Sequence, residues 1–146
     1  MKVEGMVSHR HNGQAVVELA IALLFLMVFA LGTVDFGRIF YANIALVNAA
    51  REGVQVAVSL PADDPSYAAT VKSAVTSVAI DPFSGPIDSA KVDPGSAYDD
   101  HRTVSVDYSF KLVLPFLGGL IDKSASNVVP LYATATLPVA NRPVNS

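Results

Sequence analysis

The chain contains one apolar run that is long enough to cross a lipid bilayer. The run reads GQAVVELAIALLFLMVFALG from Gly13, and no charged residue occurs between Leu19 and Val34. A transmembrane helix needs about 20 predominantly apolar residues. One lysine and one arginine precede the run, and basic residues in this position favour a cytoplasmic N-terminus. We therefore expect a membrane-spanning helix over residues 14–34.

Glu18 places a carboxylate near the start of this run, where an isolated charge is unfavourable. A charge at the bilayer centre costs about 2.5–3.5 kcal/mol on insertion scales, and less near a helix end. Cleavage between Gly13 and Gln14 would give Gln14 a free ammonium, one helical turn from Glu18 on the same face. Glu18 could then pair with that ammonium, with the helix dipole, or with a neighbouring subunit's terminus. We therefore predict a leader peptide over residues 1–13.

The helical pattern continues beyond the apolar run but becomes one-sided. In DFGRIFYANIALVNAAREGVQVAV the apolar residues recur at spacings of three and four, which is typical of an amphipathic helix. The expected buried stripe consists of Phe36, Ile39, Phe40, Ile44, Val47, Ala50, Val54 and Val58. The alanines of this segment either allow close packing or act as helix formers without a partner. They are Ala42, Ala45, Ala49 and Ala50. The helix is expected to extend over residues 35–58 and to end before Pro61.

The remaining sequence predicts a second helix and a small sheet. DPSYAATVKSAVTSVAI has helical spacing, with Asp64 or Ser66 as the N-cap. The side chains expected to be buried are Tyr67, Val71, Val75 and Val78. A short strand is expected at Ala90–Val92. TVSVDYSFKLVL and VVPLYATATLPV alternate apolar and polar residues, as half-buried strands do. Their expected inner faces are Val104, Val106, Tyr108, Phe110, Leu112 and Leu114, and Val129, Leu131, Ala133, Ala135 and Leu137.

These elements together predict an α+β fold. A sheet this small is not stable alone and needs an apolar cover. The amphipathic half of the long helix provides that cover, so we expect the helix to pack on a small antiparallel sheet with one short extra helix. Residues 59–146 would then form an extracytoplasmic α+β domain.

Composition argues against several classes of function. Only 16% of residues are charged and the net charge is −3, so the chain lacks a basic surface for nucleic acid. Cysteine is absent, and His101 is the one histidine beyond the predicted leader, which argues against a zinc site. No nucleophile-elbow or phosphate-loop motif occurs. We expect no enzymatic activity, no metal or other cofactor, and no small-molecule substrate.

The long helix resembles a known family over about residues 13–58. The sequence of Gly13, four residues and Glu18, ahead of an apolar helix, is similar to a type IV prepilin processing site. With the DFGR and NAAREG blocks, it closely resembles the TadE-like pseudopilins of the tight adherence (Flp) pilus systems. This resemblance implies cleavage by a prepilin peptidase and a role as a minor pilin in pilus assembly. The implied partners are inner-membrane lipid, other pseudopilins and the pilus assembly platform.

Five charged residues of the long helix are candidate partner contacts: Glu18, Asp35, Arg38, Arg51 and Glu52. Asp35 and Arg38 are three residues apart. They could form a surface ion pair of about 0.2–0.5 kcal/mol at the edge of the membrane, or a docking point for a partner. Arg51 and Glu52 are expected to meet the C-terminal sheet or, alternatively, a partner.

Other interpretations of the same residues remain open at this point. The chain could be an uncut bitopic membrane protein with an extracytoplasmic binding or sensor domain. Alternatively, the apolar run could be a secretory signal peptide cut after Gly32, which would release a secreted protein. The mature N-terminus distinguishes these possibilities: Gln14 for the pseudopilin, Met1 for the uncut anchor and Thr33 for the secreted form.

Overall fold

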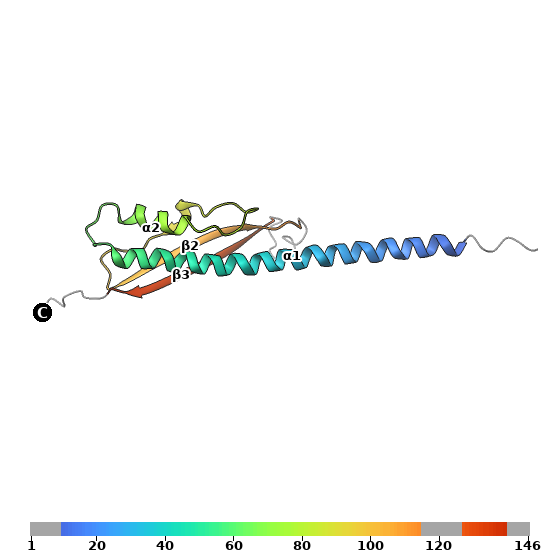
Figure 1. Cartoon of the computed structure of the whole chain (residues 1–146), viewed down its shortest axis with the longest axis horizontal. Helices are drawn as coiled ribbons and strands as arrows, with labels where there is room; N and C mark the ends of the chain where they lie inside the picture. The colour runs from blue at the N-terminus through green and yellow to red at the C-terminus, as the bar shows by residue number, and fades with distance from the viewer. Residues whose placement is uncertain (1–9, 115–126, 140–146) are drawn as a thin grey trace, which may run out of the picture.

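One helix runs the length of the molecule and carries a small domain on its second half (Figure 1). The structure, a computed structural model, describes residues 10–114 and 127–139. The helix α1 (Arg10–Ser59) is 50 residues long and continuous. It begins at Arg10, ahead of Gln14, so Gly13 lies inside it rather than before it. No proline precedes Pro61, and α1 ends two residues before that proline, as expected.

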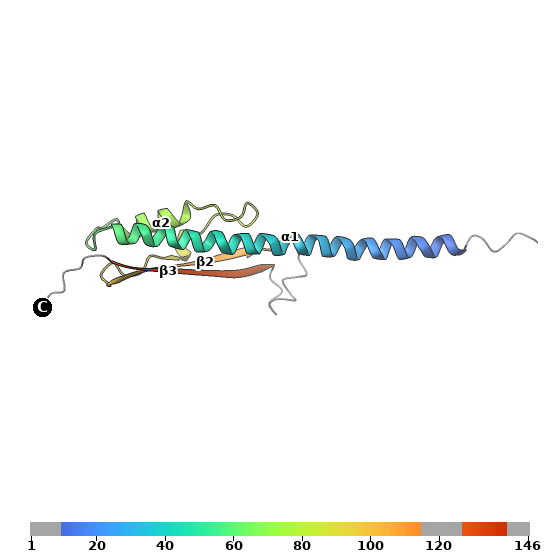
Figure 2. The ribbon, with the colours of Figure 1, turned by 60° about the horizontal axis from the view of Figure 1, so that its bottom comes forward.

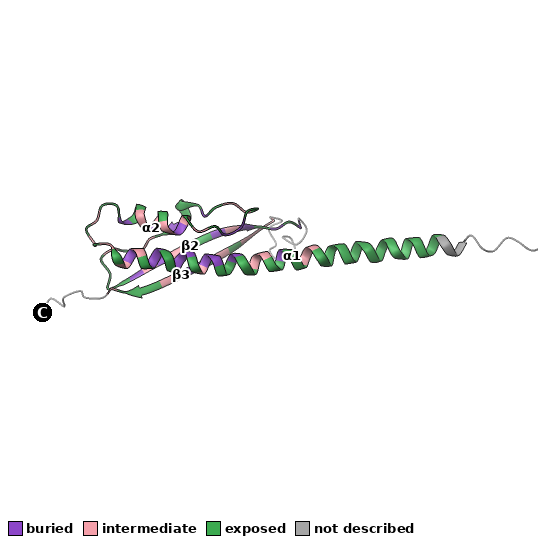
Figure 3. Cartoon of the chain, in the orientation of Figure 1, coloured by how far each residue is buried: buried purple, intermediate pink, exposed green. Residues whose placement is uncertain are grey.

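From Gly13 to Ala30, α1 is exposed on all sides (Figure 3). The helical stretch Gly13–Ser59 includes an 18-residue window with a mean hydropathy of 2.6, and none of that window is buried. An apolar helix of this length without protein neighbours fits a membrane anchor.

The second half of α1 packs against a sheet on one side and against a second helix on another (Figure 2). The sheet contains three antiparallel strands in the order β1 (Val92–Asp93), β2 (His101–Lys111) and β3 (Val128–Pro138). In its centre, Val106 pairs with Val92 on one side and Ala133 on the other. The α+β prediction is therefore confirmed.

The strand faces follow the alternation in the sequence. All six predicted inward side chains of the first long strand segment, Val104 to Leu114, are buried. On β3 the predicted inner face is buried or half-buried around Ala133 and becomes exposed at Leu137. The strand expected at Ala90–Val92 is only partly formed. The Asp88 carboxylate accepts a hydrogen bond from the Ala90 amide and starts a 3₁₀ turn, η1 (Ser89–Lys91), so β1 begins at Val92.

The second helix, α2 (Tyr67–Thr76), has Ser66 at its N-cap position. The Ser66 side chain makes no capping bond; instead Asp64 accepts hydrogen bonds from the Ser66 amide and hydroxyl. Three of the four predicted inward residues, Tyr67, Val71 and Val75, are buried. Val78 lies beyond the end of the helix and is half-buried.

The predicted buried stripe of α1 is partly wrong. Phe36, Phe40 and Ile44 are 72%, 63% and 48% exposed. The buried face instead carries mostly small side chains: Ala42, Ala45, Leu46, Ala49, Ala50, Gly53, Val54 and Ala57. A helix can approach a sheet and a second helix closely only where its side chains are small. The four alanines therefore have a packing role.

Gly53 lies where α1 closely approaches both α2 and β2. A Cβ atom at this position would overlap the Val75 side chain and lie 3.2 Å from Val104 Cγ1. Alanine is favoured over glycine in helices by about 1 kcal/mol, but forcing an extra carbon into a packed core costs about 1–3 kcal/mol. We expect Gly53→Ala to lower the thermal unfolding midpoint of the domain, measured in detergent by near-ultraviolet circular dichroism.

Gly37→Ala is the matched control, because nothing lies within 4 Å of a Cβ at Gly37. This variant should keep or slightly raise the midpoint. Equal midpoints for the two alanine variants would show that the packing at Gly53 is looser than the structure indicates.

Candidate functional site

The predicted processing residues lie on the exposed N-terminal half of α1. Gln14 and Glu18 are one turn apart, and the Gln14 side-chain amide donates to Glu18 Oε1 at 3.2 Å. In the uncleaved chain Gln14 has no free ammonium, but its side-chain amide is still close enough to bond to the Glu18 carboxylate. Cleavage after Gly13 stays a prediction.

Asp35 is buried where α1 enters the domain. Its side chain is 1% exposed. The carboxylate accepts hydrogen bonds from the amides of Val113, at 3.1 Å to each oxygen, and Leu114, at 3.0 Å. Both amides lie just after the end of β2, and they donate to a side chain of α1 instead of to a strand carbonyl. Asp35 thus satisfies two backbone donors that lie 78 and 79 residues further along the chain.

Arg38 connects Asp35 to a third segment. Its Nη1 donates to Asp35 Oδ1 at 2.9 Å, while Nη2 and Nε donate to the two oxygens of Asp81 at 2.7 and 3.3 Å. The guanidinium carbon lies 4.8 Å from the centre of the Phe83 ring and 4.9 Å from that of Phe110. A planar guanidinium suits such combined bidentate and ring contacts, which a lysine could not reproduce.

Asp81 starts a tight turn that is fixed by its own side chain. The Ser84 amide donates to Asp81 Oδ2 at 2.8 Å, and the Tyr108 hydroxyl donates to the Gly85 carbonyl at 2.7 Å. Burial alone would raise the pKa of the Asp81 carboxyl. Hydrogen bonds from Arg38 and Ser84 outweigh burial, so this pKa lies below its usual value and the group stays ionised at neutral pH.

This buried network differs from the surface ion pair that the spacing of Asp35 and Arg38 allowed. The pair does form, but Asp81 and the amides after β2 complete it inside the domain. We call Asp35, Arg38 and Asp81 the junction network. Sequence reasoning missed Asp81. The DPFSG sequence shows that a turn is present, but nothing local indicates a partner 43 residues earlier.

The two other candidate contacts on α1 lie differently from expectation. Arg51 and Glu52 are both exposed. The helix meets β2 and α2 through their neighbours, Ala50, Gly53 and Val54, which are buried. The expectation that Arg51 and Glu52 meet the sheet is therefore wrong.

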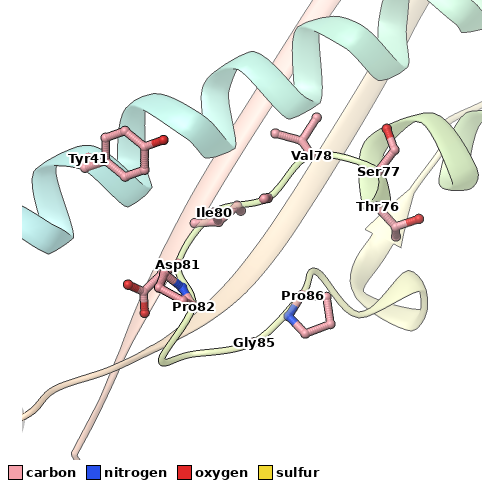
Figure 4. Close-up of a pocket in the computed structure, with 10 residues that line it drawn as sticks. Tyr41, Thr76, Ser77, Val78, Ile80, Asp81, Pro82, Gly85 and Pro86 are labelled. Atoms are coloured by element: carbon pink, nitrogen blue, oxygen red, sulfur yellow. The ribbon is translucent and has the colours of Figure 1, made fainter.

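An open hollow of about 460 Å³ lies beside Tyr41, between α1 and the loop that follows α2 (Figure 4). Its lining is largely apolar, as with Val78, Ile80 and Pro86. Asp81 reaches its edge, but Arg38 and Ser84 already engage that carboxylate. Within residues 10–114 and 127–139, no three His, Cys, Asp or Glu residues gather as a possible metal site. The hollow therefore offers a surface for contact rather than a set of reactive groups.

The family model of the TadE-like proteins matches residues 13–55. The chain is TadE-like over this segment. No curated protein and no solved structure matches the chain. The TadE-like segment contains Gly13, Glu18, Asp35 and Arg38, whereas Asp81 and the amides after β2 lie outside it. The junction network therefore joins the TadE-like helix to the part of the chain beyond the family match.

The match to the TadE-like family model over residues 13–55 suggests a part in the tight adherence pilus system. It fits a structural component of that system rather than an enzyme. It also fits a membrane location, since α1 has the length and apolarity of a membrane anchor.

Proposed function

We propose that this protein is a minor pilin or pseudopilin that takes part in assembly of a tight adherence (Flp) pilus. The observation that carries the proposal is the TadE-like match over an apolar helix whose first half has no protein neighbours. A prepilin peptidase would remove residues 1–13. Residues 14–34 would span the bacterial inner membrane, with a cytoplasmic N-terminus. Residues 35–58 and 59–146 would form the extracytoplasmic part.

In this proposal cleavage creates the charge that Glu18 needs. The new Gln14 ammonium and the Glu18 carboxylate lie one turn apart in one chain, and they would also meet across two neighbouring chains. In a low-dielectric environment such a pair is strong and directional, so it favours one axial register between subunits. Other pseudopilins and the assembly platform would then contact the exposed residues Arg51 and Glu52.

The junction network has a different part in the proposal. The side chains of Asp35 and Arg38 already bond to groups inside the domain. They would therefore act by holding the domain at a set angle on the helix. Partner contact would come from exposed residues around them.

The mature N-terminus tests the processing step. Sequencing the protein from its native cells should give Gln14 as the first residue, and Gly13→Leu should abolish this product because a large side chain replaces glycine at the cleavage site. Gly32→Leu is the control, since it alters the candidate signal peptidase site alone. A first residue of Met1 would support the uncut anchor, and Thr33 a secreted protein. Either result would contradict the proposal.

A further inference from the structure

Large apolar side chains outside the predicted span lie mainly on the half of the domain that is nearer the span. They belong to α1, to the turn after Asp81, to the segment after β2 and to β3. We call this set the apolar collar: Phe36, Phe40, Tyr41, Phe83, Val113 and Tyr132, each at least 50% exposed. In the described part of the domain, Tyr98 and Leu137 are the exposed large apolar residues at the opposite end of the sheet, and Ile44, 48% exposed, lies on α1 between the two ends. The exposed apolar surface is therefore concentrated where the helix leaves the domain.

The collar begins where the membrane-length segment ends. With a rise of about 1.5 Å per residue, Phe36 lies about 3 Å and Phe40 about 9 Å beyond Val34 along the helix axis. The headgroup layer adds about 5–8 Å to each side of the hydrocarbon core, and a tilt of about 20° would lower one side of the domain further. Phe36 therefore lies at the height of the headgroup layer, and Phe40 reaches that layer on the side that a tilt lowers.

The arrangement of the collar suits an interface. Phe36, Phe40 and Tyr132 line a groove of about 240 Å³ between α1 and β3, so the collar extends from the helix onto the sheet. Aromatic residues are enriched at both membrane–water interfaces of membrane proteins. An exposed cluster of large apolar side chains is typical of a surface that contacts a membrane or another protein.

Three charged side chains at this end are drawn inward, whereas Asp107 and Lys111 on β2 stay exposed. The side chains of Asp35, Arg38 and Asp81 are 1%, 14% and 6% exposed, and they neutralise one another. Phe83 and Phe110 cover the guanidinium. A free carboxylate at this height would face a lipid environment that disfavours charge. The junction network therefore keeps its own three charges away from the surface around Phe36 and Phe83.

We propose that the apolar collar lies in the interface of the bilayer that α1 spans, so that the domain rests on lipid instead of standing clear of the membrane. The collar would contact lipid at the boundary between the headgroups and the acyl chains. The proposal rests on membrane insertion of α1, which is part of the proposed function. It does not depend on processing or on the pilus.

Tryptophan fluorescence tests this placement, because the chain contains no tryptophan. Four single-tryptophan variants of the full chain are reconstituted in phosphatidylcholine vesicles: Phe25→Trp in the span, Phe36→Trp and Phe40→Trp in the collar, and Tyr98→Trp at the far end. All four positions are at least 63% exposed, so the substitutions should not disturb the core. Lipids brominated at different acyl depths serve as quenchers.

The expected result is a graded loss of emission. Deep bromines should quench Phe25→Trp most, and shallow bromines should quench both collar variants, while Tyr98→Trp keeps its emission. Quenching of Phe25→Trp with unquenched, red-shifted collar variants would overturn the collar proposal and leave insertion intact. Blue-shifted but unquenched collar variants would show that protein covers the collar instead of lipid. Failure to quench Phe25→Trp would overturn both insertion and this proposal.

Discussion

Replacing Asp35 with alanine is expected to lower the free energy of unfolding of the domain by about 3–5 kcal/mol, the usual cost of removing one partner from a buried ion pair. The Asp35 carboxylate is 1% exposed and accepts from the Val113 and Leu114 amides as well as from Arg38. Alanine would leave the buried Leu114 amide and the part-buried Val113 amide without this acceptor, and a buried unsatisfied donor costs about 1–3 kcal/mol. Small domains are stable by only about 5–15 kcal/mol, so the helix–domain junction should loosen markedly.

The measurement is equilibrium unfolding in detergent, followed by near-ultraviolet circular dichroism and by protease sensitivity after β2. Asp107→Ala is the matched control, because Asp107 is exposed on β2 and its removal should change the free energy by no more than about 0.5 kcal/mol. Asp35→Asn should fall between the two, since it keeps an acceptor but loses the charge. If Asp35→Ala unfolded like Asp107→Ala, the junction network would have no part in stability.

The second large effect is expected at the other end of α1. Glu18→Ala should leave membrane insertion intact, because it removes a charge from an apolar segment. It should strongly reduce the amount of assembled pilus, because the Gln14 ammonium of the processed chain would lose its anionic partner. Pilus yield on native cells and the membrane content of the protein are the two measurements.

The Gln14→Ala variant distinguishes the contribution of the terminal ammonium from that of the Gln14 side chain. In the full chain the Gln14 amide bonds to Glu18, but after cleavage any residue at this position carries an ammonium. Gln14→Ala should therefore assemble normally if the terminal charge matters. Normal pilus yield from Glu18→Ala would refute the register hypothesis. Equal losses from Glu18→Ala and Gln14→Ala would assign the effect to the side-chain bond.

Local periodicity predicted the buried face correctly wherever the pattern allowed only one face to be apolar. The alternation from Val104 to Phe110 allowed only one face to point inward, and the structure buries that face. The continuity of α1 also followed from local features, because no proline interrupts the segment before Pro61. The spacing of Asp35 and Arg38 correctly indicated that these two side chains can meet on one helix.

The sequence alone thus determined the two helices and the two long strands, that the first helix can anchor in a membrane, and that the helix resembles the TadE-like family. Tertiary structure decided which side of α1 is buried. Both a bulky side, with Phe36 and Phe40, and a small side, with Ala42 and Ala49, have apolar helical spacing. Close packing against β2 and α2 admits only the small side. Tertiary structure also brought Asp81 to Arg38, because contacts between residues 43 positions apart depend on how the chain folds back and leave no local pattern.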